Sequence, residues 1–348
     1  MEPLTSAILY RVSTALTFRI LRLLADGDFH SGATLARRLD VSRGTVWNAV
    51  RALDGLGLEV HRVPGRGYRL AEPFSLLDRA AIARHAGDAS ARLAIEVADV
   101  ADSTNSMLMA RAATGAASGT VLAAEWQESG RGRRGRAWHA GLGGGVTFSL
   151  LWRFVQGPSA LAGLSLAAGL ALVRAMSALG AGDVALKWPN DVLWRNGKLA
   201  GLLIEMHGDA LGPSAVVIGI GINVRLSDAV RSRIDQPAED LETASGGAVD
   251  RNAVLGRVLA ESTSMLDAFS RDGFAPLRAE WERHHAHQDK AVTVTLPDGR
   301  SHEGIARGVG DDGALLFETG NAVRRLHSAE LSLRGASRSE ARRARTDA

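Results

Sequence analysis

Hydrophobic residues in the first part of the chain recur at helical spacing in three short stretches. The first stretch covers residues 18–24, and the second begins after Ser31, a residue type that often caps the start of a helix. The third begins after Ser42, and its apolar face is formed by Val46, Val50 and Leu53. Two short helices joined by a tight turn predict a helix-turn-helix.

The pattern changes to short extended runs after the third helix. Residues 58–63 and 68–70 are predicted strands, and the Pro-Gly-Arg-Gly segment at 64–67 is the turn between them. These elements predict a winged helix-turn-helix DNA-binding domain over residues 18–70. Residues 71–75 break the pattern and form the predicted linker.

The central region mixes strand-like apolar runs with two long helical patterns. The predicted strands are 147–154, 184–186, 199–205 and 215–220, and the predicted helices are 162–179 and 251–270. This mixture predicts an α/β domain with a mixed sheet over residues 76–285. The most apolar stretch, near 161–173, is interrupted by glycine and serine and is too short to span a bilayer, so we expect no membrane segment.

Short strands separated by turn sequences follow this domain. The predicted turns lie at 297–299, 311–313 and 319–321, where aspartate, asparagine and glycine gather. They predict a small SH3-like β-barrel over residues 288–334. The last stretch, 335–348, is rich in arginine and lacks apolar periodicity, which predicts a basic disordered tail.

Composition and charge narrow the possible functions. Residues 1–75 contain ten Arg and seven Asp plus Glu, and residues 334–348 contain five Arg and two acids, although the whole chain has a net charge of only +3. Basic ends around a mildly acidic body indicate nucleic-acid contact attached to an enzyme or a ligand-binding core. The absence of cysteine excludes disulfides, cysteine nucleophiles and thiolate zinc sites. Together with a start unlike a signal peptide, it leads us to expect a cytoplasmic protein.

The strongest chemical signal is an alternation of glycine and arginine over residues 130–136, followed by Trp138. Glycine lets backbone N–H groups approach an anion, and guanidinium groups can neutralise a triphosphate or hold a carboxylate through paired hydrogen bonds. We expect this loop to be mobile until an anion binds. The alternative is a disordered, RNA-binding arginine patch.

Three more motifs follow this arginine loop. They are Lys187-Trp188-Pro189-Asn190-Asp191, Gly197-Lys198-Leu199-Ala200-Gly201 and Gly219-Ile220-Gly221-Ile222-Asn223. Each alone has an ordinary structural reason: a solvated turn lysine, a capping aspartate or a close-packed pair of glycines. Their presence together is harder to attribute to structure alone.

These motifs, in this order, resemble those of the biotin protein ligase family. Ser103-Thr104-Asn105 is similar to its first biotin-contact motif, and residues 124–127 with the arginine loop are similar to its second. The N-terminal segments at 30–32, 47–48 and 63–68 resemble the bacterial subgroup that doubles as the repressor of the biotin operon. The resemblance covers about residues 18–334 and implies that the central domain is a catalytic domain of the biotin/lipoate ligase type.

The resemblance also implies the reaction and the partners. ATP and Mg²⁺ would convert biotin to biotinyl-5′-AMP, and the biotinyl group would pass to a lysine of the biotin carboxyl carrier protein of acetyl-CoA carboxylase. A ligand-promoted homodimer would bind operator DNA and repress biotin synthesis. The rival functions are a lipoate-type ligase, which shares the fold, and a transcription factor that senses a ligand without catalysis.

Site residues follow from the resemblance, position by position. The biotin-binding residues would be Ser103, Thr104, Asn105, Gln127, Arg131, Gly132, Arg133 and Lys198. The ATP-binding residues would be Arg131, Arg134, Arg136, Trp138, Asn190 and Asn223. The catalytic residues would be Lys198, Arg133, Asp191 and Lys187, with Asp191 orienting or deprotonating the carrier lysine. The DNA-binding residues would be Ser42, Arg43, Thr45, Asn48 and Arg66.

Other interpretations stay open for some of these residues. Ser103 and Thr104 could simply cap a helix, and Trp138 could belong to the core. The cluster of His284, His285 and His287 is interpreted as a solvated helix end, and no protein metal site is expected. A run of glycines at 143–145 replaces the asparagine-containing strand start that is usual in the family, so the resemblance does not fix the geometry of that loop.

Overall fold

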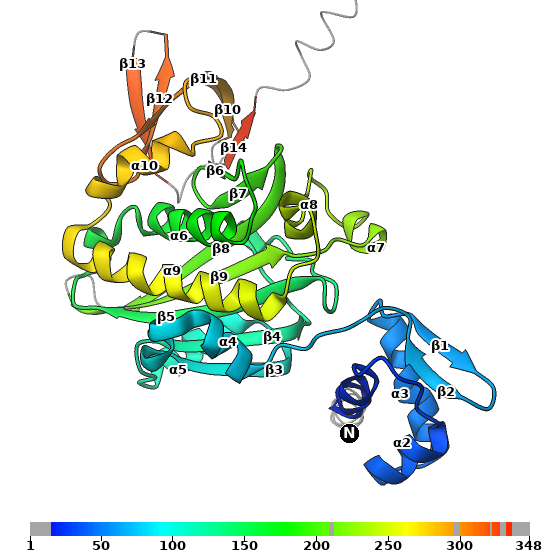
Figure 1. Ribbon diagram of the computed structural model, residues 1–348. Coiled ribbons are helices and arrows are strands. Elements are labelled where there is room, and N and C mark those ends of the chain that lie inside the picture. Colours follow the sequence, from blue (N-terminus) through cyan, green and yellow to red (C-terminus); the bar gives the residue numbers. More distant parts are fainter. Residues whose placement is uncertain (1–14, 209–211, 296–299, 321, 328–331, 336–348) are drawn as a thin grey trace, which may run out of the picture.

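The computed structural model describes residues 15–208, 212–295, 300–320, 322–327 and 332–335. The predicted turn at 297–299 and nearly all of the predicted tail lie outside these residues. Three parts follow one another along the chain: a small helical domain with a hairpin, a central sheet covered by helices, and a second small sheet (Figure 1).

The N-terminal part is the predicted winged helix-turn-helix. A first helix over residues 15–24 is followed by α2 (Gly32–Leu39), α3 (Arg43–Gly55), β1 (Val60–Val63) and β2 (Gly67–Leu70). Ser31 and Ser42 cap α2 and α3, because each side chain accepts a hydrogen bond from the backbone N–H three residues later. The antiparallel pair β1–β2 forms the wing.

The central sheet has seven strands in the order β3-β4-β5-β9-β8-β7-β6. Only β3 and β4 pair in parallel, so the sheet is mixed as predicted. The strands are β3 (Ala94–Ala101), β4 (Thr120–Gln127), β5 (Gly145–Phe154), β6 (Ala185–Lys187), β7 (Asp191–Trp194), β8 (Gly197–Gly208) and β9 (Ser214–Asn223).

Helices cover both faces of this sheet. On one face α5 (Thr104–Ala113) packs against Leu151 and Val217, and the opposite face carries the main core with α6 (Leu164–Ala178) and α9 (Arg251–Asp272). The helix α4 (Arg79–Ala86) packs on α9, and three short helices complete the connections. These are α7 (Asp228–Arg231), α8 (Leu241–Ser245) and α10 (Arg278–Arg283).

The helical segment around α6 extends beyond the apolar run that the sequence analysis judged too short to span a bilayer. Within the described part of the chain, Pro158–Ala178, a 3-10 turn followed by α6, is by length and composition alone apolar enough to cross a membrane. Two thirds of its most apolar window is buried inside the protein, where α6 packs against α9 and against the strands β6, β7 and β8. Its hydrophobicity is that of a central core helix.

The C-terminal part is the predicted small antiparallel β domain. Its strand order is β13-β12-β11-β10-β14, formed by β10 (Ala291–Thr295), β11 (Ser301–Val309), β12 (Leu315–Thr319), β13 (Ala322–Leu326) and β14 (Ser332–Gly335). The domain is held against the central sheet at β6. There the indole N–H of Trp188 donates to the carbonyl of Gly313 at 3.0 Å, and the backbone of Leu186 bonds to His284 and Ala286.

The predicted linker at 71–75 is in contact with the central domain. Gly143 has a φ of +74°, and a Cβ added to it would overlap the ring of Phe74, so the glycine run leaves room for the linker. The side chains of Arg22 and Asp99 form an ion pair between the first helix and β3. Leu142 also belongs to the apolar core of the helix-turn-helix. The winged helix-turn-helix domain therefore packs directly on the central domain.

A buried ion pair fixes the start of the central domain. Arg251 and Glu125 lie 2.8 Å apart, with only 5% and 1% of their side chains exposed. Arg251 also donates to the carbonyls of Ser75 and Gly145, and Glu125 accepts from the backbone N–H of Leu77. The pair thus joins α9, β4, the linker and the first residue of β5.

Replacement of Glu125 by alanine should destabilise the central domain by about 3–5 kcal/mol, because Arg251 would remain buried without a counter-charge. The midpoint of urea unfolding of the full chain measures this effect. The matched control is Glu96→Ala, which removes the exposed Arg111–Glu96 pair and should cost less than about 1 kcal/mol. Equal losses from the two variants would contradict the structural role of the buried pair.

Candidate functional site

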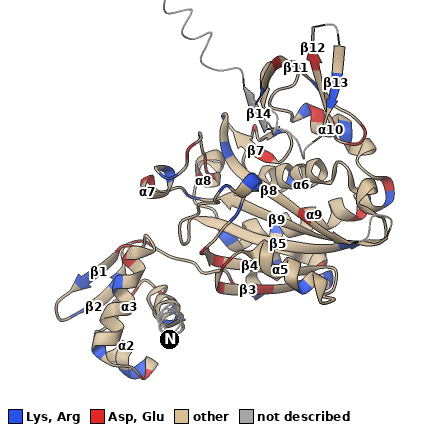
Figure 2. Ribbon diagram, turned by 180° about the vertical axis from the view of Figure 1, so that it is seen from behind, with Lys and Arg blue, Asp and Glu red and all other residues tan. Residues whose placement is uncertain are grey.

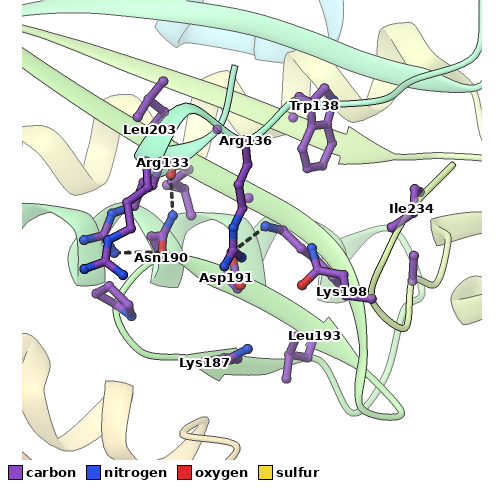
Figure 3. A pocket seen from close by; sticks show the side chains of 18 of the residues that line it. Arg133, Arg136, Trp138, Lys187, Asn190, Asp191, Leu193, Lys198, Leu203 and Ile234 are labelled. Atoms are coloured by element: carbon purple, nitrogen blue, oxygen red, sulfur yellow. Dashed lines mark hydrogen bonds and ion pairs between the residues drawn. The ribbon is translucent and has the colours of Figure 1, made fainter. Parts of the chain in front are cut away.

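A large cavity of about 1400 Å³ is lined by strands β5, β9, β8 and β7 of the central sheet and reaches the small β domain. It is lined by every residue that the sequence assigned to biotin binding, ATP binding or catalysis. These are Ser103, Thr104, Asn105, Gln127, Arg131, Gly132, Arg133, Arg134, Arg136, Trp138, Lys187, Asn190, Asp191, Lys198 and Asn223. Motifs more than a hundred residues apart in the sequence therefore meet in one place (Figure 3).

The arginine loop forms a short hairpin over this cavity. The backbone N–H of Gly132 donates to the carbonyl of Arg136 at 2.7 Å, and that of Trp138 donates to Gly130 at 2.8 Å. Arg134, at the tip, has a left-handed φ of +57° and is followed by Gly135 at +72°. The hairpin aims several guanidinium groups at the cavity. Its mobility before an anion binds remains a prediction.

Two arginines of the hairpin contact different elements beside the cavity. Arg131 donates to the hydroxyl of Ser106 at 2.6 Å and lies 3.4 Å from Glu205, whereas Arg133 donates to the side-chain oxygen of Asn190 at 3.2 Å. Burial, together with the nearby charge of Arg134, lowers the pKa of Arg133 from its ordinary value. A poorly hydrated guanidinium of this kind gains most when an anion binds beside it.

Lys198 and Asp191 form an ion pair at the floor of the cavity. Their Nζ and Oδ1 atoms are 2.7 Å apart, and both side chains are less than one fifth exposed. The Lys198 ammonium also lies 5.7 Å from the centre of the Trp138 ring. Any role of Asp191 toward another amine therefore requires that Lys198 first turns to a new anionic partner (Figure 3).

Glycines in two of the motifs leave room for Trp138. Gly201 and Gly221 face each other on β8 and β9, and a Cβ on Gly221 would overlap the indole ring. Trp138 thus lies flat on the sheet without joining the core, and it lines the cavity with one aromatic surface. A flat π surface beside cationic groups suits a nucleobase next to its phosphates.

Asn223 has a structural task that the sequence did not indicate. Its side-chain amide donates to the carbonyls of Lys198 and Glu239, at 3.0 and 3.1 Å. Both of its N–H groups are thereby used to hold the strand that carries Lys198 against the segment at 233–239. Only its oxygen remains to contact a ligand, so the predicted ATP contact narrows to an acceptor.

Ser103 and Thr104 lie at the start of α5 and at the cavity, and their contact with biotin stays a prediction. Ser103 caps α5, because its hydroxyl accepts from the backbone N–H of Ser106, and both residues also line the cavity. Sequence reasoning missed their neighbours Ser149 and Glu205, which bond to the same group of side chains. The available signal was Ser149 itself, a polar residue in the middle of the apolar strand β5.

The histidine cluster is not a solvated helix end, so that prediction was wrong. His285 is buried, and its ring packs on Trp281 with centroids 4.6 Å apart. Burial lowers the pKa of His285 to about 4, and burial together with the charge of Lys187 lowers the pKa of His287 to about 4. The cluster lies where the small β domain docks, and His287 and Lys290 from that side line the cavity. Sequence reasoning did not find this second wall.

The predicted DNA-binding residues lie on α3 and the wing. The hydroxyls of Ser42 and Thr45 bond to each other at 2.8 Å and serve the helix cap, and the guanidinium of Arg66 stacks on Phe29. Arg43 and Asn48 are exposed. Basic residues lie on α2, α3 and the wing (Figure 2).

Two further residues of α3 face away from the domain core and were missed. Trp47 is 45% exposed, and the guanidinium of Arg51 lies 4.7 Å from the centre of its ring. The buried face of α3 consists of Val46, Ala49, Val50 and Leu53. Its opposite face therefore presents Trp47, Asn48 and Arg51 together, as expected of a helix that reads a groove of DNA.

Comparison with known proteins agrees with this geometry. Residues 97–223 match the biotin/lipoate A/B protein ligase family, residues 17–69 match a helix-turn-helix domain, and residues 287–334 match the biotin protein ligase C-terminal domain. The fold and the site therefore define the class of biotin protein ligases.

Individual relatives narrow the class. The chain is 37% identical to the bifunctional ligase/repressor BirA of Salmonella typhimurium, over 93% of this chain and 99% of that protein. It is 36% identical to the Escherichia coli protein of the same name, over 91% and 97%. The Aquifex aeolicus biotin protein ligase in complex with biotin and ATP superposes with a TM-score of 0.59 at 28% identity, over 69% of this chain and 98% of that structure. The chain belongs to the bifunctional ligase/repressor group of the biotin protein ligase family.

The buried histidines make docking of the small β domain sensitive to pH. Because their pKa values are about 4 in the folded protein and about 6.5 in an unfolded chain, the folded state binds fewer protons between these values. Stability should therefore be full above pH 6.5 and fall as the pH drops toward 4.

Melting temperatures of the full chain between pH 7.5 and 4.5 test this expectation. His285→Gln should flatten the pH dependence, whereas His302→Gln, at an exposed histidine of the small β domain, should leave it unchanged. A parent profile without this acid loss would show that the imidazoles are not held neutral.

Proposed function

We propose that the cavity performs ATP-dependent biotin ligation in two steps and that the N-terminal domain represses transcription in response to biotin. The chain is a biotin protein ligase with a helix-turn-helix repressor domain. One observation carries the proposal. The arginine hairpin, the Lys198–Asp191 ion pair and the polar side chain of Thr104 all line the same cavity. The lipoate-type alternative is not favoured, because the chain also matches the C-terminal domain of biotin ligases.

The first step joins the biotin carboxylate to the α-phosphorus of ATP and releases pyrophosphate. Arg131 and Arg133 would hold the carboxylate and the phosphates through charge-assisted hydrogen bonds, and Trp138 would stack on adenine. Lys198, already inside the cavity, would leave Asp191 for the reacting carboxylate and stabilise the negative charge of the transition state.

In the second step a lysine amine of the carrier protein attacks the acyl carbon of biotinyl-5′-AMP, an amide bond forms, and the acyl–phosphate bond breaks with release of AMP. An ordinary lysine has a pKa near 10.4, so only a small fraction is uncharged at neutral pH. Once Lys198 turns to the adenylate, Asp191 is left without its partner and can accept a hydrogen bond or a proton from the incoming amine. The carboxylate of Asp191 thus pairs with Lys198 before the substrates react and with the carrier lysine in the second step.

Mg²⁺ would enter with ATP and share the charge of its phosphates. In the part of the chain that the structure describes, no group of three or more His, Asp or Glu side chains could hold a metal ion by itself. Among the described residues, Asp191 and Asp235 are the carboxylates that line the cavity. This donor set fits an ion held mainly by substrate oxygens, with at most one or two protein ligands.

Replacement of Lys198 by alanine should lower the rate of adenylate formation by about a hundredfold or more, because one preorganised cation is lost from the transition state. Biotin-dependent pyrophosphate release measures this step. The control is Arg195→Ala, which removes a cation stacked on Trp194 in the same hairpin but outside the cavity. Unchanged turnover of the Lys198 variant, with a normal melting curve, would remove the catalytic assignment.

We also propose that α3 enters the major groove of an operator, with two copies of the chain on two half-sites. Asn48 and Arg51 face outward beside Trp47, and Arg43 lies at the start of the same helix. One such domain makes few contacts, so a homodimer would supply the affinity, and adenylate bound under the arginine hairpin would favour the dimer. A cytoplasmic location fits both activities.

Asn48→Ala and Arg51→Ala should each weaken specific DNA binding by about tenfold or more, since a good base contact contributes about 1–3 kcal/mol. The probe is a duplex selected from a random library by the parent protein with biotin and ATP. Arg79→Ala, an exposed arginine on α4, controls for the loss of one positive charge. Biotin transfer should stay unchanged, and a matching loss from Arg79→Ala would show only nonspecific attraction.

A further inference from the structure

A chain of hydrogen-bonded side chains runs from Glu205 to the edge of the cavity. The amide N–H₂ of Asn105 donates to Glu205 at 2.6 Å, and the hydroxyl of Ser149 lies 2.8 Å from both the Asn105 oxygen and the Thr104 hydroxyl. The backbone N–H and the hydroxyl of Thr104 both donate to the side-chain oxygen of Gln127, at 2.8 and 3.2 Å. The mechanism described above makes no use of Glu205 or Ser149.

The three middle groups of this chain are shielded from water, whereas the side chain of Glu205 at its end is 31% exposed. Ser149 is fully buried, and Thr104 and Asn105 are only 3% and 4% exposed. Gly219 supports the arrangement, because a Cβ there would overlap the side-chain oxygen of Asn105. Water cannot easily replace a missing partner in such a place, so each hydrogen must have a defined direction.

The carboxylate at one end decides these directions. A carboxylate only accepts hydrogen bonds, so Asn105 turns its N–H₂ to Glu205 at 2.6 Å and its oxygen to Ser149. The carbonyl of Leu203 accepts a longer bond of 3.4 Å from the same N–H₂ and favours the same orientation, but the shorter, charge-assisted bond to Glu205 is the stronger one. Ser149 has one proton and must give it to Asn105. The Thr104 proton then points to Ser149 or to Gln127, both within the wall.

The result is a fixed polarity at the cavity surface. The hydroxyl oxygen of Thr104 keeps a lone pair for a ligand N–H. The Gln127 oxygen is occupied by Thr104, so its amide N–H₂ is left for a ligand carbonyl. An acceptor beside a donor matches the N–H and C=O of a cyclic urea.

We propose that Glu205 is a positioning residue that fixes this donor and acceptor pattern and thereby selects a cyclic urea. The inference rests on the proposed biotin ligase function and adds a residue that acts on binding through Asn105 and Ser149. With glutamine at 205, either end of the side chain can face Asn105. Asn105 can then turn over, and Ser149 can give its proton to Thr104.

Glu205 also forms an ion pair with Arg131, and the effect of this contact must be measured separately. That ion pair is 3.4 Å long, and about 44% of the Arg131 side chain is exposed, so solvent weakens it. Ser106 holds the same guanidinium at 2.6 Å. Ser106→Ala therefore loosens Arg131 without touching the hydrogen-bonded chain, which makes it the matched control.

The experiment measures the dissociation constants of biotin, dethiobiotin and ATP for the full-length protein by titration calorimetry. Glu205→Gln and Ser149→Ala should each weaken biotin, and equally dethiobiotin, which keeps the cyclic urea, by about tenfold, the typical cost of one misdirected hydrogen bond. ATP affinity should change by less than about twofold. The double variant should lose no more than either single variant, because both break the same chain.

Several results would overturn the inference while the parent still binds biotin. The first is a Glu205→Gln variant that binds biotin as tightly as the parent. The second is a double variant whose loss of biotin affinity is the product of the two single losses. The third is a Ser106→Ala variant that loses as much biotin affinity as Glu205→Gln. If Ser149→Ala does not fold, Glu205→Gln with its partly exposed side chain decides alone, by its separate effects on biotin and ATP. Failure of the parent to bind biotin would instead remove the proposed function itself.

Discussion

The buried ion pair between Arg251 and Glu125 is the constraint on which the arrangement of this protein depends. Two charges in a dry core are tolerated only when every donor and acceptor is satisfied, and here the carbonyls of Ser75 and Gly145 and the N–H of Leu77 complete the set. Because these groups come from four separate segments, the pair can form only when all four are in place. The charge pair thus selects one mutual arrangement.

The segments that the ion pair holds together are in contact with both the cavity and the helix-turn-helix domain. Gly145 opens β5 and pairs with Asn223 on β9, and Asn223 holds the strand of Lys198. On the other side, the segment that Arg251 clamps continues into Phe74, which fills the space left by Gly143 beside the helix-turn-helix. A displacement of the cavity floor therefore has a short mechanical route to the DNA-reading domain through packed atoms.

Much of the architecture could be predicted from the sequence, because it depends on local patterns. The caps at Ser31 and Ser42 and the apolar strand before Asn223 are read from neighbouring residues, and the fold agrees. The site motifs could be predicted as well, since alternating glycine and arginine in a loop suit the binding of an anion. The structure also accounts for the unusual glycines at 143–145, which leave space for Phe74 and for the backbone at Arg225.

The missed residues share a different property. Glu205 and Ser149 gain their meaning only from partners 44 to 100 positions away, which no local pattern reveals. His285 looked solvated because one of the segments packed beside it, the strand of Leu186, lies about a hundred positions earlier in the chain. For the same reason Asn223 could be recognised as a motif residue, but its hydrogen bonds to the carbonyls of Lys198 and Glu239 could not be predicted.

The second wall of the cavity has a consequence for how this enzyme could be shortened. Lys290 and His287 stand on the small β domain or at its entrance, and Trp188, next to Lys187, is bonded to that domain through Gly313. A fragment that ends with α10 would keep all the motifs but would open the cavity to solvent along one side. Such a fragment would lose part of its adenylate intermediate, because a reactive anhydride that is exposed to water is hydrolysed.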